Sequence, residues 1–311
     1  MSFNETPASE LTADYCQLKA WLSLQNLGKE VLLPKSAMRW LQTLQTSKGR
    51  QASEILIIEG IHAIQEASAG GLDILLCFSE RRFDPSWLGE SLGAKILPKL
   101  VCIPRKDMTR LATTETPPVC LALIKKPKTP AMPAVFEQDY AVKPPCLLIL
   151  DSLQDPGNVG TLIRSAVAFG LSGIISTKTT VDIFSPKVIR SSAGLVFRLP
   201  VVPTDYDLEG IMGQCPSSSR FWLTTSHATS PDGEKTHSLH PGIWLETAHS
   251  NTQWDVLILG NEGAGLSKRD GQSSKPLQAQ WLQIPTTPAC ESLNVAVAGS
   301  ILMASRYQAL G

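Results

Sequence analysis

Three short stretches in the last half of the chain share one local pattern, because each stands where an apolar strand ends and a helix could begin. They are the stretches 155–164, 258–267 and 284–296. Apolar runs that lead into helical patterns are typical of an α/β fold. Ligands bind such folds at the carboxyl ends of the strands. The pattern therefore predicts an α/β domain whose three loops are parts of one site.

The first part of the chain has a similar alternation on a smaller scale. Strands are predicted at 54–58, 73–78, 101–103 and 119–124, with helices near 61–67, 85–92 and 106–111. A segment at 128–145 then contains four prolines, which is typical of a linker. Residues 1–30 read as a weakly ordered or helical leader. We therefore expect a small α/β domain at 31–126, preceded by this leader and followed by a linker at 127–145.

The alternation restarts at Cys146 and continues to the end of the chain. Strands are predicted at 147–150, 173–176, 220–225, 255–259 and 281–284, with helices at 159–169, 185–193, 207–213 and 293–309. A long polar insertion at 226–253 carries or adjoins two tryptophans, Trp244 and Trp254. It is expected to touch RNA, a dimer partner or nothing. The second domain is predicted to span 146–311.

The composition is that of a soluble globular protein. Hydrophobic residues make up 43% of the chain and charged residues 18%. No apolar run has the length of a membrane span, and the N-terminus lacks the basic–apolar–small order of a signal peptide, so we expect a cytoplasmic protein. The seven cysteines lack any C-x-x-C pair, which favours reduced thiols. Only His237 and His240 approach a metal-ligand spacing, and no metal site is predicted.

Positive charge is unevenly distributed, although the formal net charge is zero. Residues 31–128 hold 14 Lys and Arg against 9 Asp and Glu, and residues 157–200 hold five against one. Binding to a phosphate backbone needs local positive charge rather than a basic protein. Ordinary solvated lysines would give a similar balance. Composition is thus compatible with an RNA partner without requiring one.

The first stretch leads into an amphipathic helix. Its apolar stripe consists of Val159, Leu162, Ile163, Ala166 and Val167. Arg164 falls roughly 130° away from that stripe, at about 100° per residue, and so points away from the core. Asn158 stands where an N-cap would be. From the residues alone, the two polar side chains are either a cap and a surface arginine or parts of a site.

The second stretch is rich in glycine. Gly260, Gly263 and Gly265 follow the strand at 255–259 and permit tight turns and close approach of a ligand to the backbone. Their order, G-x-x-G-x-G, is not the dinucleotide fingerprint, and the chain has no phosphate-binding P-loop. A plain glycine turn with an exposed Glu262 fits the same residues.

The third stretch joins a strand to the C-terminal helix. Pro285 ends the strand, and Ser292 is a candidate N-cap for a helix that begins near Leu293. Small residues then give this helix a surface that allows close packing; they are Ala296, Ala298, Gly299 and Ser300. A docked core helix and a ligand-binding helix terminus are both compatible with this pattern.

All three motifs, in this order, resemble those of the SpoU (TrmH) family of RNA 2′-O-ribose methyltransferases, in the SPOUT superfamily. Residues 146–311 resemble its catalytic domain, and 38–126 its N-terminal substrate-binding domain. In the latter, Arg50, the run 57–60 and the run 108–116 look like recurring features. The resemblance implies an α/β catalytic domain with a trefoil knot, a smaller L30e-like α/β domain, and a homodimer formed through the knot.

The resemblance also implies a cofactor, S-adenosylmethionine, and a set of site residues. The cofactor-binding positions carried over are Leu259, Gly260, Gly263, Ile284, Ser292 and Leu293. The catalytic positions are Asn158, Arg164, Glu262, Ser292 and Asn294. The RNA-binding positions that we predict are Arg50, Arg110, Lys187 and Arg190. No metal is implied, because a sulfonium methyl group is already activated.

The resemblance leaves the RNA substrate open. Ribosomal RNA is the preferred expectation, since the appended domain suits recognition of RNA structure, and transfer RNA is the alternative. A non-catalytic RNA-binding or ribosome-assembly protein is a third interpretation, which loss of Asn158, Arg164, Glu262 or Asn294 would have favoured. A class I methyltransferase does not fit, because the first strand of the domain is not followed by a glycine-rich turn.

Overall fold

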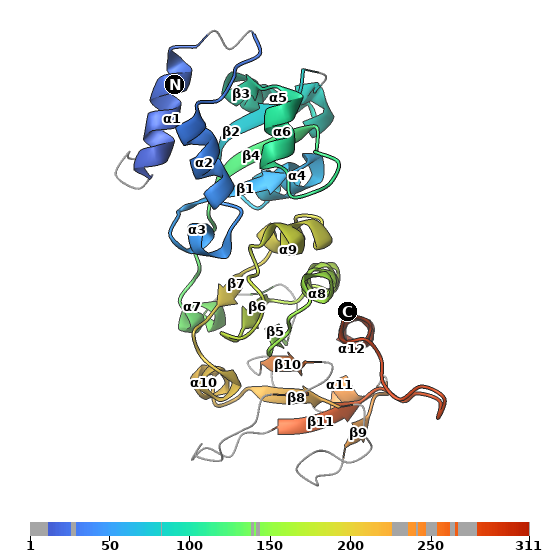
Figure 1. Ribbon diagram of the computed structural model, residues 1–311. Coiled ribbons are helices and arrows are strands. Elements are labelled where there is room, and N and C mark those ends of the chain that lie inside the picture. Colours follow the sequence, from blue (N-terminus) through green and yellow to red (C-terminus); the bar gives the residue numbers. More distant parts are fainter. Residues whose placement is uncertain are drawn as a thin grey trace. The chain divides into compact units, whose positions relative to one another are not determined.

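The computed structural model divides the chain into two compact units, which are described separately (Figure 1). It describes residues 12–25, 29–81, 83–137, 140, 144–225, 236–240, 242–246, 254–261, 265–266 and 279–310. The first unit consists of residues 1–128 and 184–198, and the second of residues 129–183 and 199–311. The segment 184–198 thus differs from the prediction, which placed it in the domain at 146–311. Glu262 and Gly263 lie outside the described residues.

The first unit is built on a four-stranded mixed sheet with the strand order β1-β4-β2-β3. Its strands are β1 (Ile55–Glu59), β2 (Ile74–Ser79), β3 (Leu100–Cys102) and β4 (Cys120–Lys125). Strand β4 is antiparallel to both β1 and β2, whereas β2 and β3 are parallel. The strands are almost wholly buried, which explains why they read as continuous apolar runs rather than as alternating ones.

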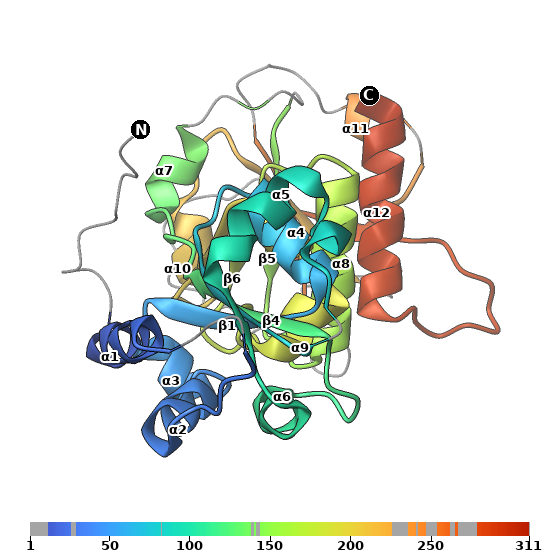
Figure 2. The ribbon, with the colours of Figure 1, turned by 90° about the horizontal axis from the view of Figure 1, so that it is seen from above.

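Helices cover both faces of this sheet. They are α1 (Ala13–Ser23), α2 (Lys35–Thr43), α3 (Ser47–Gln51), α4 (Ile61–Ala69), α5 (Glu90–Ile96) and α6 (Arg105–Leu111), with the 3₁₀ turns η2 (Pro85–Leu88) and η3 (Leu97–Lys99). Figure 2 shows α1, α2 and α6 on one side and α4 and α5 on the other. The predicted leader contributes to the core through Tyr15, Leu18 and Leu22 of α1. The helix predicted near 85–92 is divided at Gly89, whose φ is +90°.

The segment 184–198 packs closely within the first unit. It contains α9 (Pro186–Ser191), capped by Ser185, and the 3₁₀ turn η4 (Leu195–Phe197). Gly194 has a φ of +82°, and a Cβ there would lie 2.8 Å from the Ala63 Cα of α4. A 3.6 Å ion pair between Arg198 and Glu66 adds a second contact with α4. Only a glycine at position 194 allows this close approach.

The second unit is built on a parallel sheet with the strand order β7-β6-β5-β10-β8-β11-β9. Its strands are β5 (Cys146–Leu150), β6 (Gly173–Ser176), β7 (Val201–Pro203), β8 (Arg220–Thr224), β9 (His237–Ser238), β10 (Asp255–Leu259) and β11 (Ala279–Gln283). Each pair of neighbours is parallel. The carboxyl ends of β5, β10 and β11 therefore meet at one edge, as the three motifs predicted.

Helices flank this sheet on two sides (Figure 1). They are α7 (Met132–Phe136), α8 (Pro156–Ala168), α10 (Leu208–Gln214), α11 (Ile243–Glu246) and α12 (Val295–Leu310). Helix α7 lies within the predicted linker, yet Met132 and Val135 join the core of this unit. Trp244 and Trp254, which we had expected to belong to a surface insertion, are only 1% and 5% exposed. Both tryptophans are therefore core residues.

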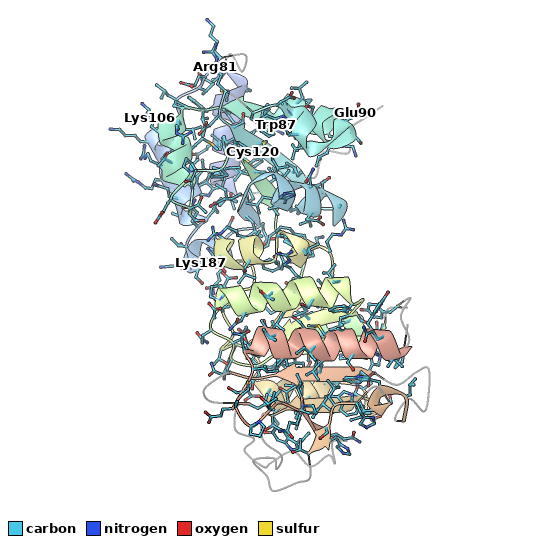
Figure 3. The ribbon with its side chains drawn as sticks, turned by 90° about the vertical axis from the view of Figure 1, so that its right-hand side faces the viewer. Arg81, Trp87, Glu90, Lys106, Cys120 and Lys187 are labelled. Carbon is cyan, nitrogen blue, oxygen red and sulfur yellow. The ribbon has the colours of Figure 1, made fainter. Side chains whose placement is uncertain are left out.

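Helices α8 and α12 lie side by side in the second unit (Figures 2 and 3). The Ser165 and Ser300 hydroxyls are 2.7 Å apart across this contact. Gly299 is buried, and a Cβ at that position would collide with the side chains of Leu162 and Leu259. The predicted small-residue surface of the C-terminal helix is thus confirmed at Gly299 and Ser300.

Within the described ranges, no helix is both long and apolar enough to cross a bilayer.

Candidate active site

The first motif places Asn158 inside the opening turn of α8 rather than at its cap. The N-cap is Asp155, whose carboxylate accepts a hydrogen bond from the Asn158 backbone N–H at 2.9 Å. Pro156 occupies the first helical turn, where its missing N–H has no cost. Of the two interpretations that the sequence left open for Asn158, the cap is therefore excluded. Since Asp155 satisfies the helix terminus, the Asn158 side chain is available for other contacts.

The third motif caps α12 with Asn294 rather than with the predicted Ser292. The Asn294 Oδ1 accepts hydrogen bonds from the backbone N–H groups of Ala296 and Val297, at 2.9 and 3.3 Å. Its Nδ2 donates to the Asn158 Oδ1 at 3.1 Å. One asparagine therefore ends a helix with its oxygen and holds the first motif with its nitrogen. Two motifs 136 positions apart are joined by this bond.

The glycine loop after β10 closes on itself. Asn261 and Gly265 exchange two backbone hydrogen bonds, of 2.9 and 2.8 Å. A Cβ at Gly260 would lie 2.6 Å from the Gly265 carbonyl oxygen, so the loop needs glycine there. The Asn261 Nδ2 donates to the Ser152 carbonyl at 3.1 Å, and the Asp151 N–H donates to the Leu259 carbonyl at 2.9 Å. The second motif is thus fastened to the loop after β5.

Arg164 lies on the solvent face of α8. It is exposed, as are positions 157, 161 and 168. This spacing of four, three and four residues defines one face of the helix. The exposure of Arg164 agrees with the sequence pattern. Among the described residues, the structure shows no hydrogen bond from Arg164 to Asn158 or Asn294.

The residues at this edge suit a large, partly apolar cofactor. Leu259 is 1% exposed, Ile284 and Leu293 are half-buried, and Ser292 is exposed. Together with the bare backbone of Gly260, they combine apolar surface with backbone donors and acceptors and add no charge. Ligand sites commonly have such a lining. In the described parts of the chain, no three His, Cys, Asp or Glu side chains gather as a metal site would require.

The predicted RNA-binding residues differ in their surroundings. Arg50 is 6% exposed, and its Nη1 donates to the Gln45 carbonyl, so its guanidinium contributes to the fold. That Arg50 binds RNA stays a prediction. Arg110 is exposed, and its Nη1 lies 3.8 Å from the Asp107 Oδ1. Lys187 and Arg190 are exposed on α9.

The structure brings together the two recurring runs of the N-terminal domain. Glu59, from the run 57–60, accepts hydrogen bonds from the N–H and the hydroxyl of Thr113, from the run 108–116, at 2.8 and 2.7 Å. Arg190 donates to the same Thr113 hydroxyl at 3.3 Å. Both runs resemble features of the family, and nothing in their sequences indicates that they meet.

A second polar cluster, at the amino end of β10, was not anticipated. Asp255 is 0% exposed and accepts hydrogen bonds from the Arg220 Nε, the Trp222 Nε1 and the Arg306 Nε, at 2.9, 3.2 and 2.9 Å. The Arg306 Nη2 also donates to the Pro144 carbonyl. These charges lie far apart in the sequence, and no local pattern pairs them. We call Arg220, Asp255 and Arg306 the ionic triad.

The fold and site define an α/β protein with a ligand site at the carboxyl edge of a parallel sheet. The sequence profile described as the SpoU rRNA Methylase family matches residues 145–304. A second profile, the MRM3-like substrate binding domain, matches residues 35–122. The chain therefore belongs to the SpoU rRNA methylase family, which confirms the resemblance noted from its motifs. The first profile includes the segment 184–198.

Individual relatives agree with this assignment. The 23S rRNA (guanosine(2553)-2′-O)-methyltransferase RlmP of Bacillus subtilis is 31% identical over 269 residues, which cover 84% of this chain and 91% of RlmP. The uncharacterized tRNA/rRNA methyltransferase slr1673 of Synechocystis is 29% identical over 276 residues, covering 86% and 88%. The AdoMet-bound rRNA methyltransferase from Sinorhizobium meliloti has a TM-score of 0.69 at 23% identity, covering 91% and 98%. This last likeness concerns the fold alone.

Proposed function

We propose that this chain is an S-adenosylmethionine-dependent methyltransferase that acts on the 2′-hydroxyl of a ribose in ribosomal RNA. The observation that carries the proposal is the Asn158–Asn294 hydrogen bond. It joins the first and third motifs at the sheet edge where the glycine loop also lies. Family membership and the activity named for RlmP support the same reaction.

The cofactor fits the described edge. Leu259, Gly260, Ile284, Ser292 and Leu293 would hold it, and the predicted Gly263 would join them. When bound, S-adenosylmethionine supplies a methyl group that its positive sulfur has already activated. The protein must then orient the ribose hydroxyl and assist the loss of its proton.

Arg164 is proposed to hold the target phosphate and to stabilise negative charge on the attacking ribose oxygen. An arginine is a poor general base, because its guanidinium stays protonated in proteins. Its planar guanidinium, however, can donate two parallel hydrogen bonds to the oxygens of one phosphate. Asn158 and Asn294 orient the hydroxyl and keep the two motifs in register. Glu262 stays a predicted member of this group.

Ribosomal RNA is preferred to transfer RNA for two reasons. The substrate-binding profile covers most of the N-terminal domain. In addition, RlmP, which is named as a 23S rRNA methyltransferase, aligns over 84% of this chain. The name of the Synechocystis relative, which includes both RNA classes, keeps transfer RNA as the second candidate.

A homodimer is proposed to form through the exposed side of α12. Large apolar or aromatic side chains of this helix are exposed, since Val297, Ile301 and Tyr307 are 48%, 37% and 47% exposed. Exposed apolar side chains that gather on one element are often covered by a partner. Sedimentation equilibrium should give twice the chain mass, and Ile301→Glu should lower it toward one chain. The predicted trefoil knot belongs to the same proposal.

A cytoplasmic location is proposed as well. The cysteines are free thiols, and three of the seven are buried. Unpaired cysteines in this number suit a reducing compartment. Cell fractionation should recover the protein with the soluble cytoplasmic markers.

The test of the reaction is methyl transfer from labelled S-adenosylmethionine to unmodified ribosomal RNA and, in parallel, to unmodified transfer RNA. After alkaline hydrolysis, label is expected in alkali-resistant dinucleotides from ribosomal RNA, because a 2′-O-methyl group blocks cleavage of its own phosphodiester. Label in mononucleotides would mean base methylation and would overturn the proposal. Cofactor binding without any transfer would favour the non-catalytic alternative.

A further inference from the structure

Three side chains of the first unit form a hydrogen-bonded chain that ends at the surface. The Arg190 Nη1 donates to the Thr113 hydroxyl at 3.3 Å, and that hydroxyl donates to the Glu59 carboxylate at 2.7 Å. The Thr113 backbone N–H donates to the same Glu59 oxygen at 2.8 Å. Glu59 closes β1, Thr113 follows α6, and Arg190 lies on α9. Three separate elements therefore contribute to one arrangement.

The order of donors gives this arrangement a direction. Because the carboxylate draws the threonine proton toward itself, the hydroxyl oxygen becomes a better acceptor for the guanidinium. Glu59 thus acts on Arg190 through an intervening hydroxyl, and Arg190 itself is exposed. The geometry favours an arginine that is held in place yet able to bind a second group.

The backbone under Arg190 is fixed by the packing of its segment. Val188 and Ile189 are 0% and 3% exposed, and Gly194 lies against α4. Lys187, one turn before Arg190, is also exposed and extends from α9 in Figure 3. Two cations therefore share the accessible side of a short, firmly packed helix. Paired cations of this kind suit a phosphate group.

We propose that Arg190 and Lys187 form a phosphate-binding subsite for RNA, and that Glu59 and Thr113 are positioning residues that preorganise Arg190. This inference rests on the proposed function, because it takes RNA as the ligand. Preorganisation strengthens binding, since a guanidinium already held in one orientation loses less freedom when it meets a phosphate. The two recurring runs of the substrate-binding domain thereby gain a role through Arg190 of α9.

A double-mutant cycle in the full chain tests the inference. The variants are Arg190→Gln, Thr113→Val and the combination of both, with Thr113→Ser as the conservative variant and Thr109→Val as the matched control. Thr109 is a threonine on the exposed side of α6, and its hydroxyl donates to the Arg105 carbonyl. The measured quantity is the Kd for an unmodified ribosomal RNA transcript at several salt concentrations.

Arg190→Gln is expected to weaken binding about tenfold and to reduce the slope of log Kd against log salt by about one. Thr113→Val should weaken it about threefold in wild-type background and have no effect in the Arg190→Gln background, because residues that act through one another are not additive. Thr113→Ser should bind like wild type.

Several outcomes would overturn the inference. One is additivity of the two substitutions, and another is an equal loss in Thr109→Val. If the Thr113→Val protein unfolds at a clearly lower temperature than wild type, Glu59→Gln takes its place in the cycle, with the same expectation. Methyl transfer by the wild type separates the two proposals. Transfer with an additive cycle refutes the subsite alone, whereas a coupled cycle without transfer refutes the proposed activity alone.

Discussion

The two ends of strand β10 carry polar groups of opposite kinds. At its amino end, Asp255 and both arginines of the ionic triad are at most 3% exposed. At its carboxyl end, Gly265 is exposed, and the Asn158–Asn294 hydrogen bond lies at the surface of the unit. Each of these two groups is held together by hydrogen bonds between residues that lie far apart in the sequence. The comparison shows that burial, rather than polarity, separates a structural cluster from a binding site.

In the ionic triad, the buried carboxylate pairs with both buried arginines. Each Asp255 oxygen has an arginine partner, and Arg306 ties α12 to the Pro144 carbonyl at the start of the domain. Buried charges need such pairing, because an isolated one is costly. The asparagine pair has no comparable enclosure, so its polar atoms can meet a ligand. Five predictions test this contrast, beginning with the largest expected effect.

Removing the central carboxylate should cause the greatest loss of stability. Asp255→Ala leaves two buried cations without their partner and should cost about 3–5 kcal/mol of unfolding free energy. Urea denaturation of the full chain measures it. Asp205→Ala, at an exposed aspartate, is the control and should change little. Equal losses in the two variants would contradict the structural role of the triad.

Removing the exposed arginine should instead affect the reaction. Arg164→Ala is expected to lower kcat by about 10²–10³-fold, the usual effect of losing a group that stabilises developing charge. Its stability should be nearly unchanged, since Arg164 is exposed. Arg164→Lys keeps the charge but loses the planar fork and should stay well below wild type. A fully active lysine variant would contradict the assigned geometry.

Filling the contact between α8 and α12 should have an intermediate effect. Gly299→Val places methyl groups against Leu162 and Leu259, and overpacking of this kind costs about 1–3 kcal/mol. Thermal unfolding measures the loss. Ala298→Val, at the neighbouring half-buried position, is the control for introducing a valine into this helix without the collision. A Gly299→Val protein as stable as the control would refute the close packing.

The two roles of Asn294 can be separated by paired substitutions. Asn294→Ala removes the helix cap and should cost about 1 kcal/mol of stability together with activity. Asn294→Asp keeps the capping oxygen but cannot donate to the Asn158 Oδ1. This variant should therefore remain stable while methyl transfer falls. Loss of stability without loss of transfer in Asn294→Asp would show that only the cap matters.

The smallest effect concerns the reactivity of two cysteines, one beside the ionic triad and one in the loop before α12. Burial raises the pKa of the Cys146 thiol, which pairs with Asp255 in the sheet, to about 11. It should therefore stay unlabelled by iodoacetamide at pH 8, where a thiolate is required. Cys290, half-exposed in the loop before α12, should be labelled in the same sample. Mass spectrometry of tryptic peptides decides, and labelling of Cys146 in the folded protein would be the contrary result.

Local structure was predictable from the sequence because it depends on neighbouring residues. The strand at 255–259, the strand at 173–176 and the amphipathic helix with an exposed Arg164 were all found correctly. The cap of α8 was misassigned, although the pair Asp155-Pro156 carried the usual signal for a cap followed by the first turn. The motif residues at 158 and 294 were identified through the family resemblance rather than through their spacing.

Long-range pairing was not predictable in this way. Nothing near Arg220 or Arg306 in the sequence indicates that both reach Asp255, and nothing near Arg50 indicates that its guanidinium is buried. Such contacts depend on how distant elements pack. The same holds for the segment 184–198, whose periodicity predicts a helix but not the unit that it joins.

The membership of the segment 184–198 has a consequence for synthesis on the ribosome. The amino-terminal unit lacks α9 and η4 until residues 129–198 have also emerged from the exit tunnel. At about 5–20 residues per second, translation of that stretch takes several seconds, during which the nascent unit waits for its last piece. The two units therefore cannot mature strictly one after the other. A fragment ended at residue 128 would stay at this unfinished stage, and a folding chaperone would meet β1 without α9, which packs against that strand in the complete unit.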